Sequence, residues 1–108
     1  NRLKKEEVIE TNELVKEDLE QLANEGKIFA LVPLAKWYLT IPKKTDYNNS
    51  YKWLSVASAF DIPNTKKARE RIFRKVNKED LTEIQEDSNN VYTSIASVIK
   101  ASKNGELK

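Results

Sequence analysis

The spacing of the apolar residues is the feature that most constrains how this chain can fold. Between Leu81 and Val98 the apolar side chains recur at steps of three and four residues, interrupted only by Ser88, which places them on one face of an α-helix. The 108 residues include only two Gly and three Pro, so few positions oppose helix formation. No segment alternates apolar and polar residues as a half-buried strand does. The sequence therefore predicts an all-α fold.

Residues that break or cap helices divide the chain into about five helices. Residues 3–23 are predicted to form one long helix or two short ones, because Thr11 and Asn12 are weak helix formers. Gly26 is expected to end this part in a left-handed conformation. The remaining helices are predicted over residues 27–40, 47–60, 64–75 and 77–103, with Asp46 and Asn77 as caps and a break at 87–90 left open.

The helix over residues 27–40 is predicted to be the most buried of the five. Its apolar residues, which leave little polar surface, are Phe29, Ala30, Leu34, Trp37, Tyr38 and Ile41. Pro33 lies inside this pattern, where it either bends the helix or marks the first turn of a helix that begins later.

The composition excludes several kinds of active site. Without His or Cys, the chain cannot form disulfides, imidazole or thiolate metal sites, or Cys- and His-dependent nucleophiles. Neighbouring carboxylates lie among other charges rather than in the desolvated setting that an acid–base catalyst needs. These pairs are Glu6 and Glu7, Glu79 and Asp80, and Glu86 and Asp87. We therefore predict that the protein is not an enzyme, with no catalytic residue, cofactor or metal.

Charge is distributed unevenly along the chain. Residues 27–78 carry twelve Lys and Arg against three acids, whereas residues 1–26 and 79–108 have net charges of −4 and −3. Six of the cations belong to the predicted helix over 64–75, whose single acid is Glu70. Such a helix can contact phosphates or the acidic faces of this molecule or a partner. Because acidic segments flank it and Phe73 is its only aromatic residue, protein contacts are favoured over nucleic acid.

No run of about 18 apolar residues occurs, so no membrane span is predicted. The chain begins at Asn1 without a basic and apolar leader. Its location stays open between the cytoplasm and export after removal of a signal peptide.

The middle of the chain resembles a known class of helical repeat. Gly26, Ala30, Leu34 and Tyr38 recur at steps of four, and the segment DYNNSYKWLSVASA follows at 46–59. This pattern resembles the SEL-one-like repeat (SLR), a relative of the tetratricopeptide repeat, in which such residues let paired helices pack closely. Ser50 stands where the family usually has Ala. The following segment, KKARERIFRKVNKEDLTEIQ, looks like the part that closes such arrays, so the resemblance covers residues 22–86.

The resemblance implies one helical domain over residues 1–108, with an SLR-like helix pair at 26–60 and closing helices at 64–103. It also implies a right-handed α/α superhelix. Proteins of this family commonly act as scaffolds or adaptors in bacteria, so the resemblance implies a groove that binds a peptide or a protein surface.

Partner-binding residues are expected among the cations and aromatic residues of the basic region. Trp37, Tyr38 and Trp53 are assigned to the core, whereas Tyr51 is assigned to it less firmly. The expected partner is a protein or peptide with acidic features, and the predicted contacts are Lys36, Lys43, Tyr47, Tyr51, Lys52, Phe60, Arg69, Arg71 and Arg74. The alternative is a nucleic-acid-binding domain that uses the basic helix over 64–76, and self-association of the chain is also considered.

Overall fold

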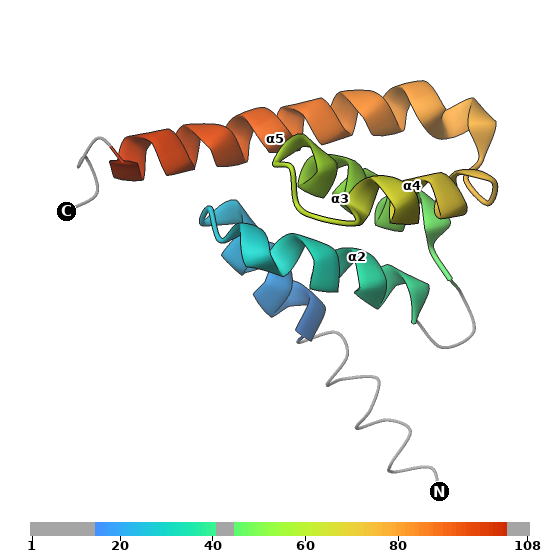
Figure 1. Cartoon of the computed structure of the whole chain (residues 1–108), viewed down its shortest axis with the longest axis horizontal. Coiled ribbons are helices and arrows are strands. Elements are labelled where there is room, and N and C mark those ends of the chain that lie inside the picture. The colour runs from blue at the N-terminus through green and yellow to red at the C-terminus, as the bar shows by residue number, and fades with distance from the viewer. Residues whose placement is uncertain (1–14, 41–44, 104–108) are drawn as a thin grey trace, which may run out of the picture.

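The computed structural model describes residues 15–40 and 45–103, and within these ranges it contains helices and turns but no strand. A first helix covers residues 15–24 and is followed by α2 (Leu31–Leu39), α3 (Tyr47–Ala59), α4 (Thr65–Phe73) and α5 (Leu81–Lys103). Two short 3-10 helices, η1 (Ile28–Ala30) and η2 (Lys78–Asp80), lead into α2 and α5. The predicted all-α fold class is confirmed (Figure 1).

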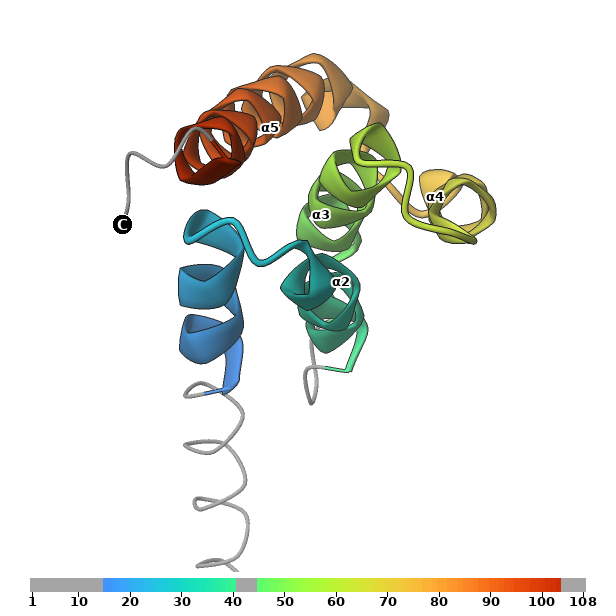
Figure 2. The ribbon, with the colours of Figure 1, turned by 60° about the vertical axis from the view of Figure 1, so that its left-hand side comes forward.

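The centre of the fold is α3, which contacts α2, α4 and α5. Figure 2 shows α5 crossing one side of α3, with α2 and the helix over 15–24 on the other side. The residues of α3 that this arrangement buries are Ser50, Tyr51, Trp53, Leu54, Val56, Ala57 and Ser58. This burial is possible because apolar or small side chains lie around most of the circumference of α3.

The prediction that the second helix would be the most buried is wrong. Within α2 only Leu31, Leu34 and Ala35 are buried, and Phe29 in η1 is 68% exposed. The physical reason is position: α3 is covered by three neighbours, whereas α2 lies at the side of the molecule and keeps one face in solvent.

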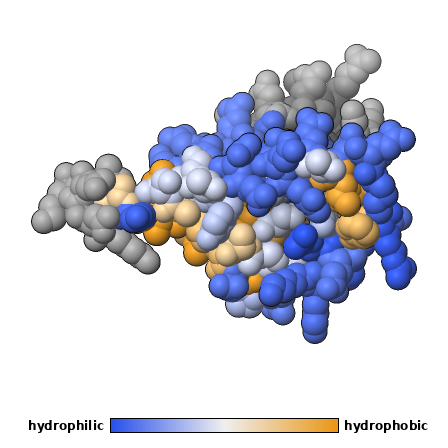
Figure 3. All heavy atoms as spheres, turned by 90° about the horizontal axis from the view of Figure 1, so that it is seen from above, coloured by the Kyte–Doolittle hydropathy of each residue, from blue (hydrophilic) through white to orange (hydrophobic). Residues whose placement is uncertain are grey.

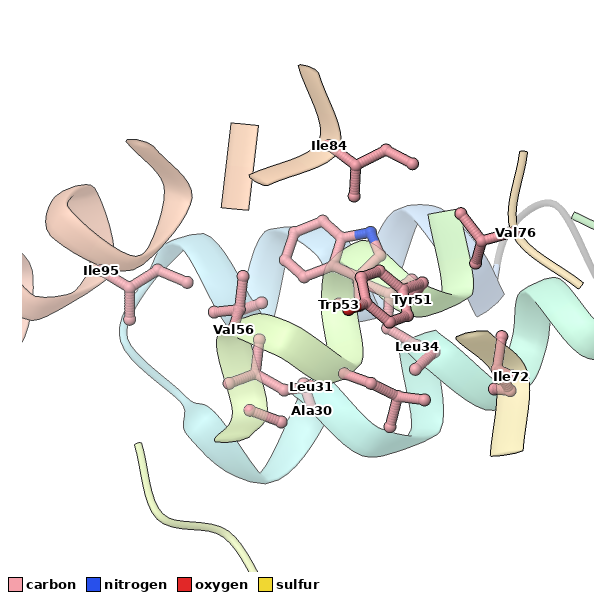
Figure 4. Packing of buried hydrophobic residues seen from close by; sticks show 14 residues of the cluster. Ala30, Leu31, Leu34, Tyr51, Trp53, Val56, Ile72, Val76, Ile84 and Ile95 are labelled. Carbon is pink, nitrogen blue, oxygen red and sulfur yellow. The ribbon is translucent and has the colours of Figure 1, made fainter. Parts of the chain in front are cut away.

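The hydrophobic core joins α2, α3 and α5. Figure 4 shows the Trp53 indole in the middle of this cluster, with Ile84 of α5 above it, Ile95 of α5 to the left and Leu31 of α2 below. Ile95 is 1% exposed and Leu31 is fully buried. Burial of such aliphatic side chains contributes about 1.5–3 kcal/mol each, so these contacts hold the three helices together.

The start of α2 explains Pro33. This residue is the third of α2, within the first turn, where a backbone N–H has no partner inside the helix and its loss costs little. Pro33 therefore marks the first turn of a helix that begins late, which is one of the two predicted possibilities, and it does not lie in the interior of a longer helix. The helix begins later than residue 27 because η1 takes up residues 28–30.

Gly26 ends the first helix as predicted, with φ at +90°. The N–H of Lys27 donates to the carbonyl of Leu22 at 2.9 Å, which closes the helix end. A Cβ on Gly26 would also lie 3.3 Å from the side chains of Val98 and Ile99, so glycine allows α5 to approach closely. The expected interruption at Thr11 and Asn12 lies outside the described residues.

Asp46 caps α3 as predicted, whereas Asn77 caps η2 and the last helix begins only at Leu81. Asp46 accepts a hydrogen bond from the N–H of Asn49 at 3.0 Å, and Asn77 accepts one from the N–H of Glu79 at 3.0 Å. The possible break at residues 87–90 does not occur, because α5 runs unbroken through them. Ser88 fits inside the helix because its hydroxyl donates to the carbonyl of Ile84 at 2.7 Å.

The first helix is attached to α2 by a polar contact. The Tyr38 hydroxyl donates a hydrogen bond to the Glu20 carboxylate at 3.1 Å. Burial, and then the negative charge of Glu20, raise the pKa of Tyr38 to about 12. The ring of Trp37 also meets that of Tyr38 edge to face, with their centres 5.1 Å apart.

The surface is mostly polar. Seen from above α5 it is largely hydrophilic, with hydrophobic surface gathered toward the C-terminal part of α5 and at the opposite end of the molecule (Figure 3). None of the helices in the described ranges combines the length and the apolar character that crossing a bilayer requires.

Candidate binding groove

A groove runs between α2 and α4, and α3 forms its floor. We call it the α2–α4 groove; its volume is about 450 Å³. Figure 2 shows that both helices lie against α3. The residues that line it are Val32, Ala35, Lys36, Leu39, Ser50, Leu54, Pro63, Asn64, Thr65, Ala68, Arg71 and Ile72. Most are apolar or small, and no acidic residue is among them, so the groove is an apolar channel with cations at its edges.

The shape of the α2–α4 groove depends on two buried hydroxyls. The Ser50 hydroxyl donates to the carbonyl of Ala35 at 2.8 Å, which joins α3 to α2. Thr65, which is 2% exposed, donates to the carbonyl of Ile62 at 2.7 Å and lies 3.1 Å from the Ser58 hydroxyl. These bonds hold both walls on α3, so the groove is formed before any partner arrives.

The first residue of α4 is preceded by a tight turn. Asp61 and Asn64 have φ angles of +59° and +69°, in the left-handed region that Asn and Asp tolerate better than other non-glycine residues. The turn lets α4 fold back beside α3 and present Ala68 and Ile72 to the groove.

Two predicted site residues lie on opposite walls of the groove. Lys36 is on α2 and Arg71 is on α4, and both side chains are exposed. No carboxylate of the described residues lies within 4.0 Å of either cationic group. Arg71 makes only a weak contact, from Nε to the carbonyl of Lys67 at 3.5 Å. Both cations therefore remain available to an acidic partner.

The other predicted residues are not part of this groove. The Nζ of Lys75 lies 6.0 Å from the ring centre of Tyr47, and the Nζ of Lys52 lies 4.9 Å from the ring centre of Trp53. Phe60 is half-buried against Tyr92, with ring centres 4.7 Å apart. These side chains occupy other sides of α3 and do not converge with Lys36 and Arg71.

Arg69 and Tyr51 form a pair on the far side of α4. The Arg69 guanidinium carbon is 5.1 Å from the centre of the Tyr51 ring, but Tyr51 is only 3% exposed. The tyrosine therefore packs in the core and does not offer a surface anchor. Arg74 is exposed beyond the end of α4, and Lys43 lies outside the described residues.

The apolar walls were not among the predicted site residues. Val32 and Leu39 are seven residues apart, which places them on one face of α2, and Ala68 and Ile72 are one turn apart on α4. This spacing is the sequence feature that could have indicated the groove, but apolar residues with the same spacing also fill a closed core.

Comparison with known protein families, curated proteins and solved structures found no match to this chain.

Proposed function

We propose that this protein is a non-enzymatic interaction module that binds a short segment of a partner protein or peptide in the α2–α4 groove. Apolar side chains of the partner occupy the channel, and acidic side chains beside them pair with Lys36 and Arg71. The observation that carries the proposal is an apolar channel edged on both walls by cations that no described carboxylate neutralises.

The energetics favour a short segment over a large surface. A volume of about 450 Å³ accommodates a few side chains rather than a whole domain face. Apolar burial supplies most of the affinity, while the two exposed cations select acidic partners and speed association. Because hydrogen bonds from Ser50 to Ala35 and between Ser58 and Thr65 already fix both walls, little ordering entropy is lost when the segment binds.

The resemblance to the SLR family supports the same role. In this interpretation α2 and α3 are the repeat-like helix pair, α4 and α5 close the array, and the right-handed superhelix remains part of the proposal. Scaffold and adaptor roles are what the resemblance implies.

A pair of labelled peptides tests the proposal by fluorescence polarisation. One peptide carries two leucines four residues apart with a glutamate on each side, and the matched peptide has glutamine in place of glutamate. The full chain is expected to bind the acidic peptide more tightly, by about three- to tenfold for two exposed ion pairs. Equal binding of both peptides, or binding of neither, would contradict the proposal.

Variants locate the site on the protein. Lys36→Glu and Arg71→Glu are expected to weaken binding of the acidic peptide, and Ala68→Leu should block the channel without changing charge. Lys100→Glu is the matched control, because Lys100 is an exposed cation on α5 that does not line the groove. Lys36, Arg71 and Lys100 each lie in the last turn of a helix, so thermal melts by circular dichroism should show a similar small loss of stability in all three charge variants. A melt that collapses in the Arg71 variant would identify this arginine as structural.

The nucleic-acid alternative rests on the exposed cations of α4. Lys66, Lys67 and Arg74 are exposed, and none of them has a described carboxylate within 4.0 Å. Titration of generic duplex DNA and single-stranded RNA at low salt discriminates the two functions. Binding that falls steeply with salt, and that Lys67→Glu weakens while Lys36→Glu does not, would favour nucleic acid over a peptide.

A further inference from the structure

A second hollow, on the other side of α4, has a different chemistry from the α2–α4 groove. It lies between α3, α4 and α5 and has a volume of about 410 Å³. Its lining residues are Ser55, Ser58, Ala59, Lys66, Arg69, Gln85, Ser88, Asn89 and Tyr92. Among the described residues, the lining contains two cations, five neutral hydroxyl or amide side chains and a tyrosine, but no carboxylate. We call it the α3–α5 hollow.

One buried hydroxyl in the α3–α5 hollow has no hydrogen-bond partner among the residues that the structure describes. The Ser58 hydroxyl shares a hydrogen bond with Thr65 at 3.1 Å, and the Ser88 hydroxyl donates to Ile84 at 2.7 Å. The Ser55 hydroxyl, by contrast, is buried and forms no hydrogen bond. A buried hydroxyl without a partner is destabilising, because it has lost its hydrogen bonds to water without replacement. Because Ser55 also lines the hollow, rotation of its side chain would bring this hydroxyl to a ligand oxygen and remove that cost.

Two cations lie at the same hollow. Lys66 and Arg69 are three residues apart on α4, so their side chains project from neighbouring positions on one face. Arg69 is held over the ring of Tyr51, with its guanidinium carbon 5.1 Å from the ring centre. No carboxylate of the described residues is within 4.0 Å of either cation, although Glu70 lines the adjoining hollow beside them.

We propose that the α3–α5 hollow binds a phosphoryl dianion, either free phosphate or the phosphate group of a monoester. Arg69 and Lys66 neutralise its charge, and the Ser55 hydroxyl donates to one of its oxygens. Gln85 and Asn89 on α5 add neutral amide donors from the opposite wall. Donors from three helices suit the three terminal oxygens of a phosphoryl dianion better than the two coplanar oxygens of a carboxylate.

The inference does not depend on the proposed peptide function. The two sites share no lining residue, because the α2–α4 groove uses Ala68, Arg71 and Ile72 of α4 whereas the hollow uses Lys66 and Arg69. Either site can therefore be disproved without affecting the other.

Titration of the isotopically labelled full chain, followed by ¹H–¹⁵N NMR at constant ionic strength, tests the proposal. The probes are inorganic phosphate and O-phosphoserine at a pH above the second phosphate pKa, with acetate as the control anion. Saturable shifts are expected for residues of the hollow with both phosphate probes, and acetate should give weaker ones. Tighter binding of O-phosphoserine would identify an ester as the source, and tighter binding of inorganic phosphate would identify the free ion.

Three variants make the test specific. Arg69→Gln is expected to weaken phosphate binding by about tenfold, as for the loss of one charge-assisted hydrogen bond. Ser55→Ala should weaken it severalfold while leaving the melting temperature unchanged or higher, because it removes an unpartnered buried hydroxyl. Lys67→Ala is the control, since Lys67 is on the same helix but does not line the hollow. Shifts that do not saturate, or an equal loss in the Lys67 and Arg69 variants, would overturn the proposal.

Discussion

The hydroxyl of Ser50 on α3 donates to the carbonyl oxygen of Ala35 on α2 at 2.8 Å, and this bond lies at the floor of the α2–α4 groove. Ser50 is fully buried and Ala35 is 1% exposed. The bond therefore ties together the two helices that share the most extensive contact, and it does so where no water can replace it. Serine suits position 50 because its small side chain allows α2 and α3 to pack closely and its hydroxyl supplies the hydrogen-bond donor.

Ser50→Ala is expected to lower the free energy of unfolding by about 1 kcal/mol, the usual net value of one neutral hydrogen bond. Ser50→Val should lower the free energy of unfolding by about 1–3 kcal/mol more, because valine also forces extra volume between α2 and α3. Urea denaturation followed by circular dichroism measures both, and Ser94→Ala, at an exposed serine of α5, is the control. Equal stability of the valine variant and the wild type would show that the helices do not pack closely here.

Ile95 packs α5 against α3: its side chain belongs to the hydrophobic core and is only 1% exposed. Ile95→Ala is expected to lower the free energy of unfolding by about 2–5 kcal/mol, and Ile95→Val by about 0.5–1.5 kcal/mol. The same denaturation experiment tests both. A loss below 1 kcal/mol in the alanine variant would mean that α5 does not pack on α3 as the structure has it.

The helix ends could be predicted from sequence because their chemistry is local. A left-handed glycine at residue 26 and a capping carboxylate at Asp46 depend on residues within one turn, and both occur as predicted. The degree of burial could not be predicted in the same way. Phe29 belongs to an apolar pattern but is 68% exposed, because η1 turns Ala30 to the core and leaves Phe29 on its outer side.

The candidate groove was predictable only in part. Lys36 and Arg71 were among the predicted contacts because they belong to the basic region, but the sequence does not show that they face one another across a channel. That arrangement depends on the turn at Asp61 and Asn64, which sets how α4 lies against α3. Apolar residues such as Leu39 and Ile72 have the same helical spacing whether they line a groove or fill a core.

Tyr38 should make stability sensitive to alkaline pH. Its pKa is raised to about 12 in the folded protein, whereas an unfolded tyrosine has a pKa of about 10. The contribution of Tyr38 to stability is therefore fully present below pH 10 and is lost as the pH rises from about 10 to 12. Denaturation midpoints measured from pH 8 to 12 should show the loss.

Tyr38→Phe is the matched variant for this effect. At pH 8 it should be less stable than the wild type by about 0.5–1 kcal/mol, because it lacks the half-exposed hydrogen bond to Glu20. The difference should shrink as the pH rises above 10, since phenylalanine does not ionise. A difference that stays constant to pH 12 would show that the Tyr38 pKa is not raised by folding.

The first turn of α4 carries charges of the unfavourable sign. It has no acidic residue and no side-chain cap at Asn64, and Lys66 and Lys67 both lie in it. Cations oppose the partial positive charge at a helix N-terminus. Lys67→Glu is therefore expected to raise the free energy of unfolding by about 0.3–1 kcal/mol at low salt.

Lys100→Glu is the matched control at the other end of a helix. The exposed Lys100 lies in the last turn of α5, where a cation is favourable. Its replacement by glutamate should therefore lower the free energy of unfolding by a similar amount. Urea denaturation in low salt and in 1 M salt, where the Debye length falls to about 3 Å, should show both effects and their suppression. A stabilised Lys100 variant, or effects that persist unchanged in high salt, would exclude the helix dipole as their cause.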